Sequence, residues 1–231
     1  MLVGVGSVRG AVVVAVALAA VLAGCAGSGD DDGKRTSGAS RAAGGAGGKR
    51  ATASGGSIGA AGSDCVLPVR FEVAKDWKAK AIDAQAELAK ASKGSGGDLS
   101  GALADSFLRQ GPVTTACEID AKPAGHIGFL RVWTGKAAGA DAGSVLREFV
   151  AAEDNVSKER YHSFRTGGGL TGVEVEYLYT SKLLDETKKE TALAVGTPDG
   201  PVVLHLGGMD TEEHEAMRPA YELAKRTLEL A

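Results

Sequence analysis

Thr191-Ala-Leu-Ala-Val-Gly196, followed by Thr197-Pro-Asp-Gly200 and then Val202-Val-Leu-His-Leu206, is the stretch that decides the fold. Both outer runs are apolar, too short for an amphipathic helix and bounded by turn-forming residues, which favours buried strands. Between them, the proline and the glycine stand where a tight turn needs them. The segment therefore predicts two strands that pair across a short turn.

Further strands are expected on either side of this hairpin. Residues 113–119 alternate between apolar and more polar side chains, which turns Cys117 toward the core. Residues 127–133 are apolar on both faces, as expected of a central strand that is covered on each side. Shorter or more polar strands are expected at residues 71–73, ending near Trp77, and at residues 173–179.

Helical patterns occur in four segments. Residues 79–90 are rich in alanine and favour a helix by propensity, and Leu99, Leu103 and Phe107 recur every four residues. Two more helices are expected after the candidate caps Asp141 and Asp210. The sum is an α+β fold, in which helices sandwich a central, mostly antiparallel β-sheet.

Residues 1–24 have the organisation of a secretory signal peptide. One positive charge, Arg9, precedes thirteen uninterrupted apolar residues at 11–23. At a rise of 1.5 Å per residue the run covers about 20 Å, which is too short for a hydrocarbon core of roughly 30 Å. A cleaved signal is therefore the better interpretation than a spanning helix.

The end of this segment, Leu22-Ala-Gly-Cys25, resembles the lipobox of bacterial lipoproteins. In that family the cysteine thiol receives a diacylglyceryl group, and a dedicated peptidase cuts just before the cysteine. The resemblance implies that Cys25 anchors the protein in the cell membrane at its extracytoplasmic face, since each buried methylene contributes about 0.8 kcal/mol. The alternative is an ordinary signal peptide with an incidental cysteine.

Residues 25–64 are expected to be a lipidated cysteine followed by a flexible tether. The thirty-nine residues after Cys25 include twelve glycines, and Ile58 is their one large apolar side chain. Such a composition buries too little surface to offset its ordering entropy. Gly55-Gly-Ser-Ile-Gly59 matches the spacing of a hydrolase nucleophile elbow, but no strand is expected before it and no helix after it. The folded domain is therefore expected at residues 65–231.

The charge and cysteine content of residues 65–231 limit the function further. This part has 20 basic and 25 acidic residues, a balance of about −5 that disfavours nucleic acid as a partner. Cys65 and Cys117 lie in a protein that carries an export signal, and in an oxidising compartment they could form a single disulfide. Two buried free thiols are the alternative.

The order of elements resembles the PsbP-like domain of LpqN-type actinobacterial lipoproteins. The resemblance rests on Phe71-Glu-Val73 leading to Trp77, on Tyr177 in a strand after Gly172, and on Arg218-Pro-Ala-Tyr221 before the final Thr227-Leu228. It implies an α/β/α sandwich around an antiparallel sheet. It also implies a non-enzymatic role in the assembly of envelope or membrane complexes, through binding of a partner or a ligand.

The motifs of the folded part do not assemble into a catalytic, cofactor-binding or metal site. Gly167–Gly172 has the spacing of a dinucleotide fingerprint but precedes a strand rather than a helix, which favours a hairpin. The histidines lack metal-ligand spacing, and His205 is interpreted as a satisfied histidine of a strand. Glu174 and Glu176 share one strand face and favour a solvated polar surface over acid–base chemistry. Residues 182–190 are expected to form an exposed hairpin tip.

Three functions remain open. The leading hypothesis is a lipid-anchored, non-catalytic binding or assembly module at the cell envelope, with a membrane protein as its partner. The second is a carrier of a small or lipidic ligand, which an apolar cleft of several hundred cubic ångströms would support. The third is a hydrolase, for which Glu174 and Glu176 with raised pKa values in a cleft would be the evidence.

Replacing the thiol of Cys25 tests the anchor. We expect Cys25→Ser to abolish retention on membranes, because serine cannot form the thioether that carries the acyl chains. Membrane fractionation and the intact mass of the protein measure the outcome. A Cys25→Ser protein that still carries lipid and sediments with membranes would show that the anchor lies elsewhere.

Overall fold

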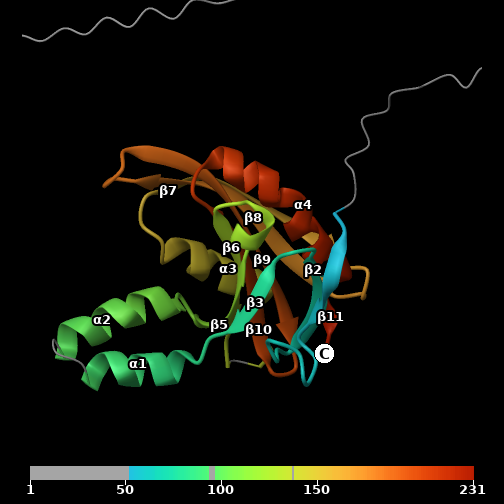
Figure 1. Cartoon of the computed structure of the whole chain (residues 1–231), viewed down its shortest axis with the longest axis horizontal. Coiled ribbons are helices and arrows are strands. Elements are labelled where there is room, and N and C mark those ends of the chain that lie inside the picture. The colour runs from blue at the N-terminus through green and yellow to red at the C-terminus, as the bar shows by residue number, and fades with distance from the viewer. Residues whose placement is uncertain (1–51, 94–96, 137) are drawn as a thin grey trace, which may run out of the picture. The chain divides into compact units, whose positions relative to one another are not determined.

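The computed structural model describes residues 52–93, 97–136 and 138–231, with the side chains of residues 97 and 98 left out (Figure 1). The expected signal peptide, Cys25 and the first part of the expected tether, up to residue 51, lie outside these ranges. In the described residues, no helix is both long and apolar enough to cross a membrane.

An antiparallel sheet of eight strands forms the centre of the domain. Seven strands lie side by side in the order β3-β5-β6-β10-β9-β8-β7, and the short β4 pairs with β5. Their bounds in chain order are Lys78–Ala81 (β3), Arg109–Gln110 (β4), Val113–Asp120 (β5), Gly128–Thr134 (β6), Val156–Arg165 (β7), Thr171–Ser181 (β8), Glu186–Thr197 (β9) and Gly200–Gly208 (β10). The α+β fold and its antiparallel sheet are as expected.

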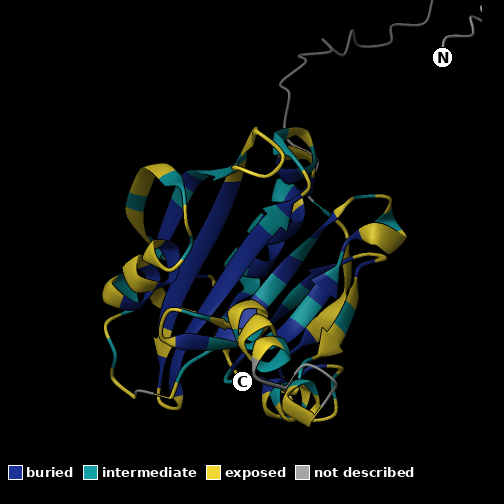
Figure 2. Cartoon of the chain, turned by 90° about the vertical axis from the view of Figure 1, so that its left-hand side faces the viewer, coloured by how far each residue is buried: buried dark blue, intermediate teal, exposed yellow. Residues whose placement is uncertain are grey.

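Strands β9 and β10 form the predicted hairpin in the middle of the sheet. Val202 pairs with Val195, and Leu204 pairs with Leu193. From Glu190 onward β9 is buried on both faces except at Gly196, and β10 is buried on both faces for most of its length (Figure 2), because successive side chains point alternately to two separate cores. Leu193 and Leu204 belong to one core, and their neighbours Ala194 and Val203 belong to the other.

One helix covers each face of the sheet. Helix α3 (Ala142–Ala151) packs its buried residues against β8, β9 and β10, and helix α4 (Thr211–Thr227) packs on the opposite face. The predicted caps are both present, since Asp141 accepts a hydrogen bond from the Ser144 amide and Asp210 accepts one from the Glu213 amide. These bonds satisfy amides that the first turn of a helix leaves free.

A second sheet of three strands contains both ends of the described domain. Strands β1 (Ser54–Ile58) and β11 (Glu229–Leu230) pair with opposite edges of β2 (Val69–Ala74). The expectation that residues 52–64 belong to the tether is therefore wrong. Glycine-rich β1 is held by backbone hydrogen bonds to β2, while Ile58 adds the one buried side chain of the strand. The elbow-like Gly55–Gly59 belongs to this strand and its turn.

Helices α1 (Ala84–Lys93) and α2 (Gly97–Leu108) form a hairpin that projects from the sheet (Figure 1). The helix expected at residues 79–90 thus begins later, because residues 78–81 pair with β5 as strand β3. Pairing in the sheet overrides the helical propensity of alanine here. The remaining short element is the 3-10 turn at Lys122–Ala124.

A disulfide joins Cys65 to Cys117, with the two Cα atoms 6.1 Å apart. Both cysteines are buried. Cys65 precedes β2, and Cys117 lies in β5, so the bond connects the segment between the first two strands of the small sheet to the main sheet.

Removing the disulfide should lower the stability of the domain. For a closed loop of about 53 residues, the chain-entropy model gives about 4 kcal/mol in the free energy of unfolding. We expect the Cys65→Ala/Cys117→Ala protein to lose an amount of this order in urea unfolding, compared with the oxidised wild type. Equal unfolding midpoints would contradict a stabilising role for the bond.

Candidate functional site

The structure places polar groups on both faces of the main sheet. Glu174 and Glu176 share one face of β8, as predicted, but this face lies against helix α4. Glu174 is only 2% exposed and is held by Lys225, at 3.0 Å, and by His162, at 2.6 Å. The expected solvated surface is therefore wrong for Glu174, because the sequence did not indicate that the cations of α4 lie opposite it.

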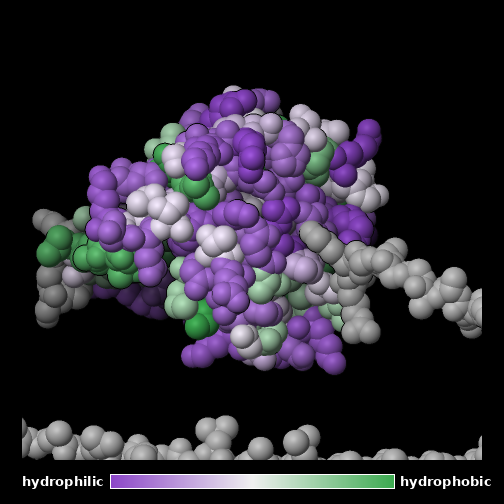
Figure 3. All heavy atoms as spheres, turned by 90° about the horizontal axis from the view of Figure 1, so that it is seen from above, coloured by the Kyte–Doolittle hydropathy of each residue, from purple (hydrophilic) through white to green (hydrophobic). Residues whose placement is uncertain are grey.

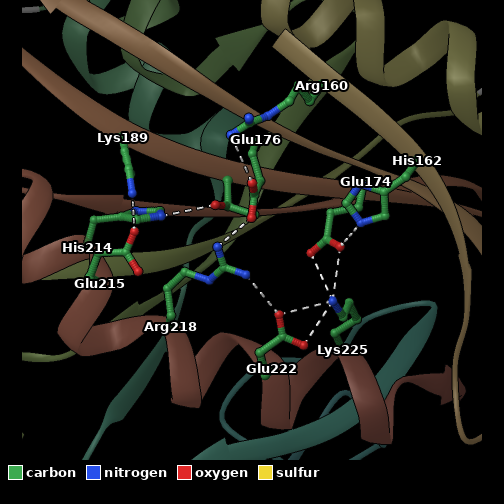
Figure 4. A network of polar contacts seen from close by, with 11 residues as sticks. Arg160, His162, Glu174, Glu176, Lys189, His214, Glu215, Arg218, Glu222 and Lys225 are labelled. Atoms are coloured by element: carbon green, nitrogen blue, oxygen red, sulfur yellow. Dashed lines mark hydrogen bonds and ion pairs between the residues drawn. The ribbon is translucent and has the colours of Figure 1, made fainter. Parts of the chain in front are cut away.

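The charges on this face form an alternating chain (Figure 4), which we call the α4 network. Its members are Arg160, His162, Glu174, Glu176, Arg218, Glu222 and Lys225. Arg218 binds Glu176 and also contacts Glu222, which in turn binds Lys225. The network therefore connects α4 with strands β7 and β8.

Glu176 lacks the raised pKa that acid–base chemistry on this face would require. The hydrogen bond from Arg218 lowers the pKa of Glu176, and the pKa of Arg218 is raised despite its burial, because Glu176 stabilises its charge. A carboxylate with a lowered pKa is a weak base, and here its oxygens already accept from a guanidinium. The chemistry of this face is that of a structural ion-pair cluster.

The other face carries a cavity of about 580 Å³, which we call the β6–β10 cavity. Strands β4, β6, β8, β9 and β10 and the end of helix α2 contribute to its wall. The residues that line it are Ser106, Phe107, Gln110, Ile127, Gly128, Phe129, Arg131, Trp133, Glu153, Tyr179, Lys188, Glu190, His205, Gly207, Gly208 and Met209. Cavities of this size are typical of small-molecule sites.

A cluster of buried and half-buried polar groups forms the floor of this cavity. Glu190 accepts hydrogen bonds from Lys188 at 2.8 Å and lies 2.6 Å from Nε2 of His205. The Tyr177 hydroxyl joins the cluster, at 2.8 Å from Glu153 and 3.2 Å from Glu190. The interpretation of His205 as a satisfied strand histidine is confirmed, whereas the exposed tip expected at residues 182–190 is wrong for the buried Glu190.

Two carboxylates of the floor have pKa values that are shifted in opposite directions. Burial raises the pKa of Glu153, and the negative charge of Glu190 adds to this effect. Burial alone would also raise the pKa of Glu190, but the nearby His205 and Lys188 outweigh it and lower that pKa. The floor therefore keeps one fixed negative charge beside a lysine, next to a carboxyl group that is easier to protonate.

Aromatic rings make up much of the wall above this floor. Phe107, Phe129, Trp133 and Tyr179 line the cavity, and the Arg131 guanidinium lies 5.1 Å from the centre of the Phe129 ring. The buried indole N–H of Trp133 has no hydrogen-bond acceptor among the described residues. The cavity thus combines aromatic walls with a small number of polar groups at its floor, which is the usual character of a ligand site.

Three other hollows differ from the β6–β10 cavity in their chemistry. One of about 390 Å³ lies beside the α4 network, and its Arg218, Glu176, Lys189 and Glu215 are already paired with one another. Another, of about 750 Å³ near β3 and β5, has a mixed polar and apolar lining without an aromatic wall. A third, of about 550 Å³, lies at the small sheet, where Arg70 already pairs with Glu229. The β6–β10 cavity is therefore the candidate functional site.

The remaining predicted motifs lie apart from this cavity. Gly167–Gly172 spans the turn between β7 and β8, as the hairpin interpretation predicted. His126 lies 3.3 Å from Glu213, and His214 contacts Thr191. In the described ranges, no three acidic, histidine or cysteine residues are grouped to hold a metal ion.

Sequence reasoning missed most of the cavity residues. Glu153 follows helix α3, and Lys188 and Glu190 lie in a run of charges that looks like an exposed turn. The available signal was the alternation of Lys188, Glu190 and Ala192, which continues the inward face of β9 beyond its apolar part.

Removing the cation beside buried Glu174 should be costly. We expect Lys225→Met to lower the free energy of unfolding by about 3 kcal/mol, because it leaves a buried carboxylate without its cation. Lys90→Met is the matched control, since the Lys90–Glu87 pair is exposed to solvent and its loss should leave the free energy of unfolding nearly unchanged. Equal effects in urea unfolding would contradict a structural role for the α4 network.

Buried His214 should make stability depend on pH. Burial lowers its pKa from 6.5 to about 4, with Glu190, Glu215, Arg218 and His205 as its charged surroundings. The unfolded chain therefore takes up this proton first, so stability is lost as the pH falls from 6.5 toward 4, by about 3 kcal/mol in total.

The pH dependence can be assigned to His214 by comparison of variants. We expect His214→Gln to remove this part of the slope of unfolding free energy against pH, while His126→Gln, on a more exposed histidine, retains it. An unchanged slope in His214→Gln would mean that another group is responsible.

Comparison with known protein families shows which family this chain belongs to. A family model described as "Uncharacterised lipoprotein" matches residues 35–228. Comparison with curated proteins and with solved structures gives no match. Because the family match spans most of the chain, this protein belongs to that family of uncharacterised lipoproteins.

Proposed function

We propose that this lipoprotein is held at the extracytoplasmic face of the cell membrane by lipid on Cys25 and acts there as a non-catalytic binding module. Membership of a lipoprotein family and the lipobox-like Leu22–Cys25 support the anchor. The similarity to PsbP-like domains of LpqN-type lipoproteins belongs to the same proposal. An antiparallel sheet with a helix on each face agrees with it.

The observation that carries the binding function is the β6–β10 cavity. Of the two binding hypotheses, it favours a small or lipidic ligand over a protein partner. A concave site of about 580 Å³ with aromatic walls can enclose most of a small ligand, whereas protein partners need broad surfaces.

The arrangement of the floor favours binding over catalysis. Glu190 is engaged by both His205 and Lys188, and Lys188 also donates to the Gly208 carbonyl at 2.8 Å. A catalytic base must have a free acceptor oxygen toward its substrate, but these groups are committed to one another. They are better suited to orient a ligand through their outer faces.

Filling the cavity tests this function. A Cβ atom added to Gly207 would lie 3.7 Å from His205 Cε1 and 3.9 Å from Glu190 Oε1, in ordinary contact. We therefore expect Gly207→Leu to fold and to place its side chain in the cavity, displacing the ligand. Native mass spectrometry of the mature lipoprotein, purified in membrane discs, measures the ligand that is retained.

Gly196→Leu is the matched control. Gly196 lies in the same hairpin, outside the cavity, and a Cβ there meets only the Ala140 carbonyl oxygen at 3.8 Å. It should retain ligand like the wild type. If wild type and Gly207→Leu carry the same molecules in the same amounts, the cavity is not the binding site. Turnover of a generic ester or glycoside by the wild type would contradict the non-catalytic role.

A further inference from the structure

A stripe of exposed apolar side chains leads out of the β6–β10 cavity along helix α2. Leu99, Leu103 and Phe107 are 70%, 54% and 76% exposed, and their spacing of four residues places them on one side of the helix. Phe107 also lines the cavity. Figure 3 shows hydrophobic residues gathered at the left of the molecule, where α1 and α2 lie in Figure 1.

Packing within the domain does not account for this stripe. No side chain described in α2 is buried, and the hairpin of α1 and α2 meets the main sheet chiefly at β4 and β5. Ile127 and Met209, which are also exposed, continue the apolar surface around the mouth of the cavity. A contiguous apolar surface of this kind is typical of a binding surface.

The cavity and the stripe together fit an amphiphilic ligand whose polar end lies in the cavity and whose apolar chain lies along the stripe. The floor presents buried polar groups, the walls are aromatic, and the stripe continues from the mouth. At 1.5 Å per residue, Leu99 and Phe107 are about 12 Å apart along the helix. That is close to the ~15 Å that one acyl chain spans in half of a bilayer's hydrocarbon core.

Charge balance limits the polar end of this ligand. Both cations among the lining residues already have a partner, because Arg131 pairs with Glu118 at 2.8 Å and Lys188 pairs with Glu190 at 2.8 Å, so neither is free to pair with a charged head. A head with a net charge would leave that charge without compensation in a partly buried site, which is unfavourable. A zwitterionic or uncharged head satisfies the same groups without this cost.

We propose that the ligand is a single-chain amphiphile without net charge, whose head lies on the Glu190–His205–Lys188 floor and whose chain lies along Phe107, Leu103 and Leu99. This inference rests on the proposed function and specifies its ligand class. A free amphiphile and a single-chain membrane lipid share this chemistry.

The test uses the full chain with Cys25→Ser, so that its own acyl chains do not compete. The probe is dodecylphosphocholine, a zwitterionic amphiphile, kept below its micelle concentration and titrated by isothermal calorimetry. We expect Phe107→Ser and Leu103→Ser each to weaken binding about tenfold, because each removes a large apolar contact with the chain. Dodecanoate and dodecyltrimethylammonium should bind at least tenfold more weakly than dodecylphosphocholine.

Leu184→Ser is the matched control. Leu184 is exposed in the turn between β8 and β9 and does not line the cavity, so its variant should bind within twofold of the wild type. The substituted side chains are all exposed, and equal unfolding midpoints in urea would show that the variants fold alike.

The outcomes separate this inference from the function on which it rests. If Gly207→Leu releases the native ligand while Phe107→Ser and Leu103→Ser bind the probe like wild type, the binding module stands and the stripe does not hold the chain. Equal binding of the charged probes overturns the neutral head. If the stripe variants lose association with phosphatidylcholine vesicles but keep the probe, the stripe is a membrane contact and the inference is wrong.

Discussion

The pairing of β9 with β10 is the constraint on which the rest of the structure depends. These strands lie in the middle of the sheet, and each sends alternate side chains into two cores. One core needs α4 and the small sheet to close it, and the other needs α3. A shift of one residue between the strands would exchange the two sets of side chains, so a single register determines where all later elements pack.

The β9–β10 hairpin could be predicted from the sequence because the residues that specify it lie close together in the chain. Apolar runs flank Thr197–Gly200, and Asp141 and Asp210 cap their helices through contacts three residues away. The sequence-based predictions are wrong where pairing with a strand that is distant in the chain determines the structure of a segment. Residues 78–81 have alanines that favour a helix, yet they pair with β5, and residues 54–58 form a strand through the backbone of β2. Edge strand β7, which is largely exposed and charged, has no apolar alternation to identify it.

The parts of the site that lie within one strand could be predicted from the sequence, whereas the parts that combine distant segments could not. The shared face of Glu174 and Glu176 follows from strand periodicity, but their partners come from α4, more than forty residues later in the chain. The cavity combines residues from α2, the turn after α3 and five strands of the sheet. Its polar floor is hidden in a charged run that resembles a surface turn, and no single segment contains the pattern.

The two faces of the sheet use charge differently. On the α4 face, cations and carboxylates satisfy one another across the helix, and the result is a connection between elements. On the α3 face, the ten-residue helix α3 leaves part of the sheet uncovered beside Trp133 and His205. The polar groups there are held in place by one another and still border open space. Similar residue types therefore form a structural cluster where a helix covers them and a binding floor where the helix leaves them uncovered.

The small sheet has a mechanical consequence. The described chain enters the fold through β1, and β1 is paired to β2 by backbone hydrogen bonds that a pull from the N-terminal side can peel apart. Such a pull can extend the residues before Cys65, but there it meets the covalent bond to Cys117 in β5. Tension is then carried through the disulfide into β5 of the main sheet, so the covalent bond limits how far the chain can be drawn out from its N-terminal side.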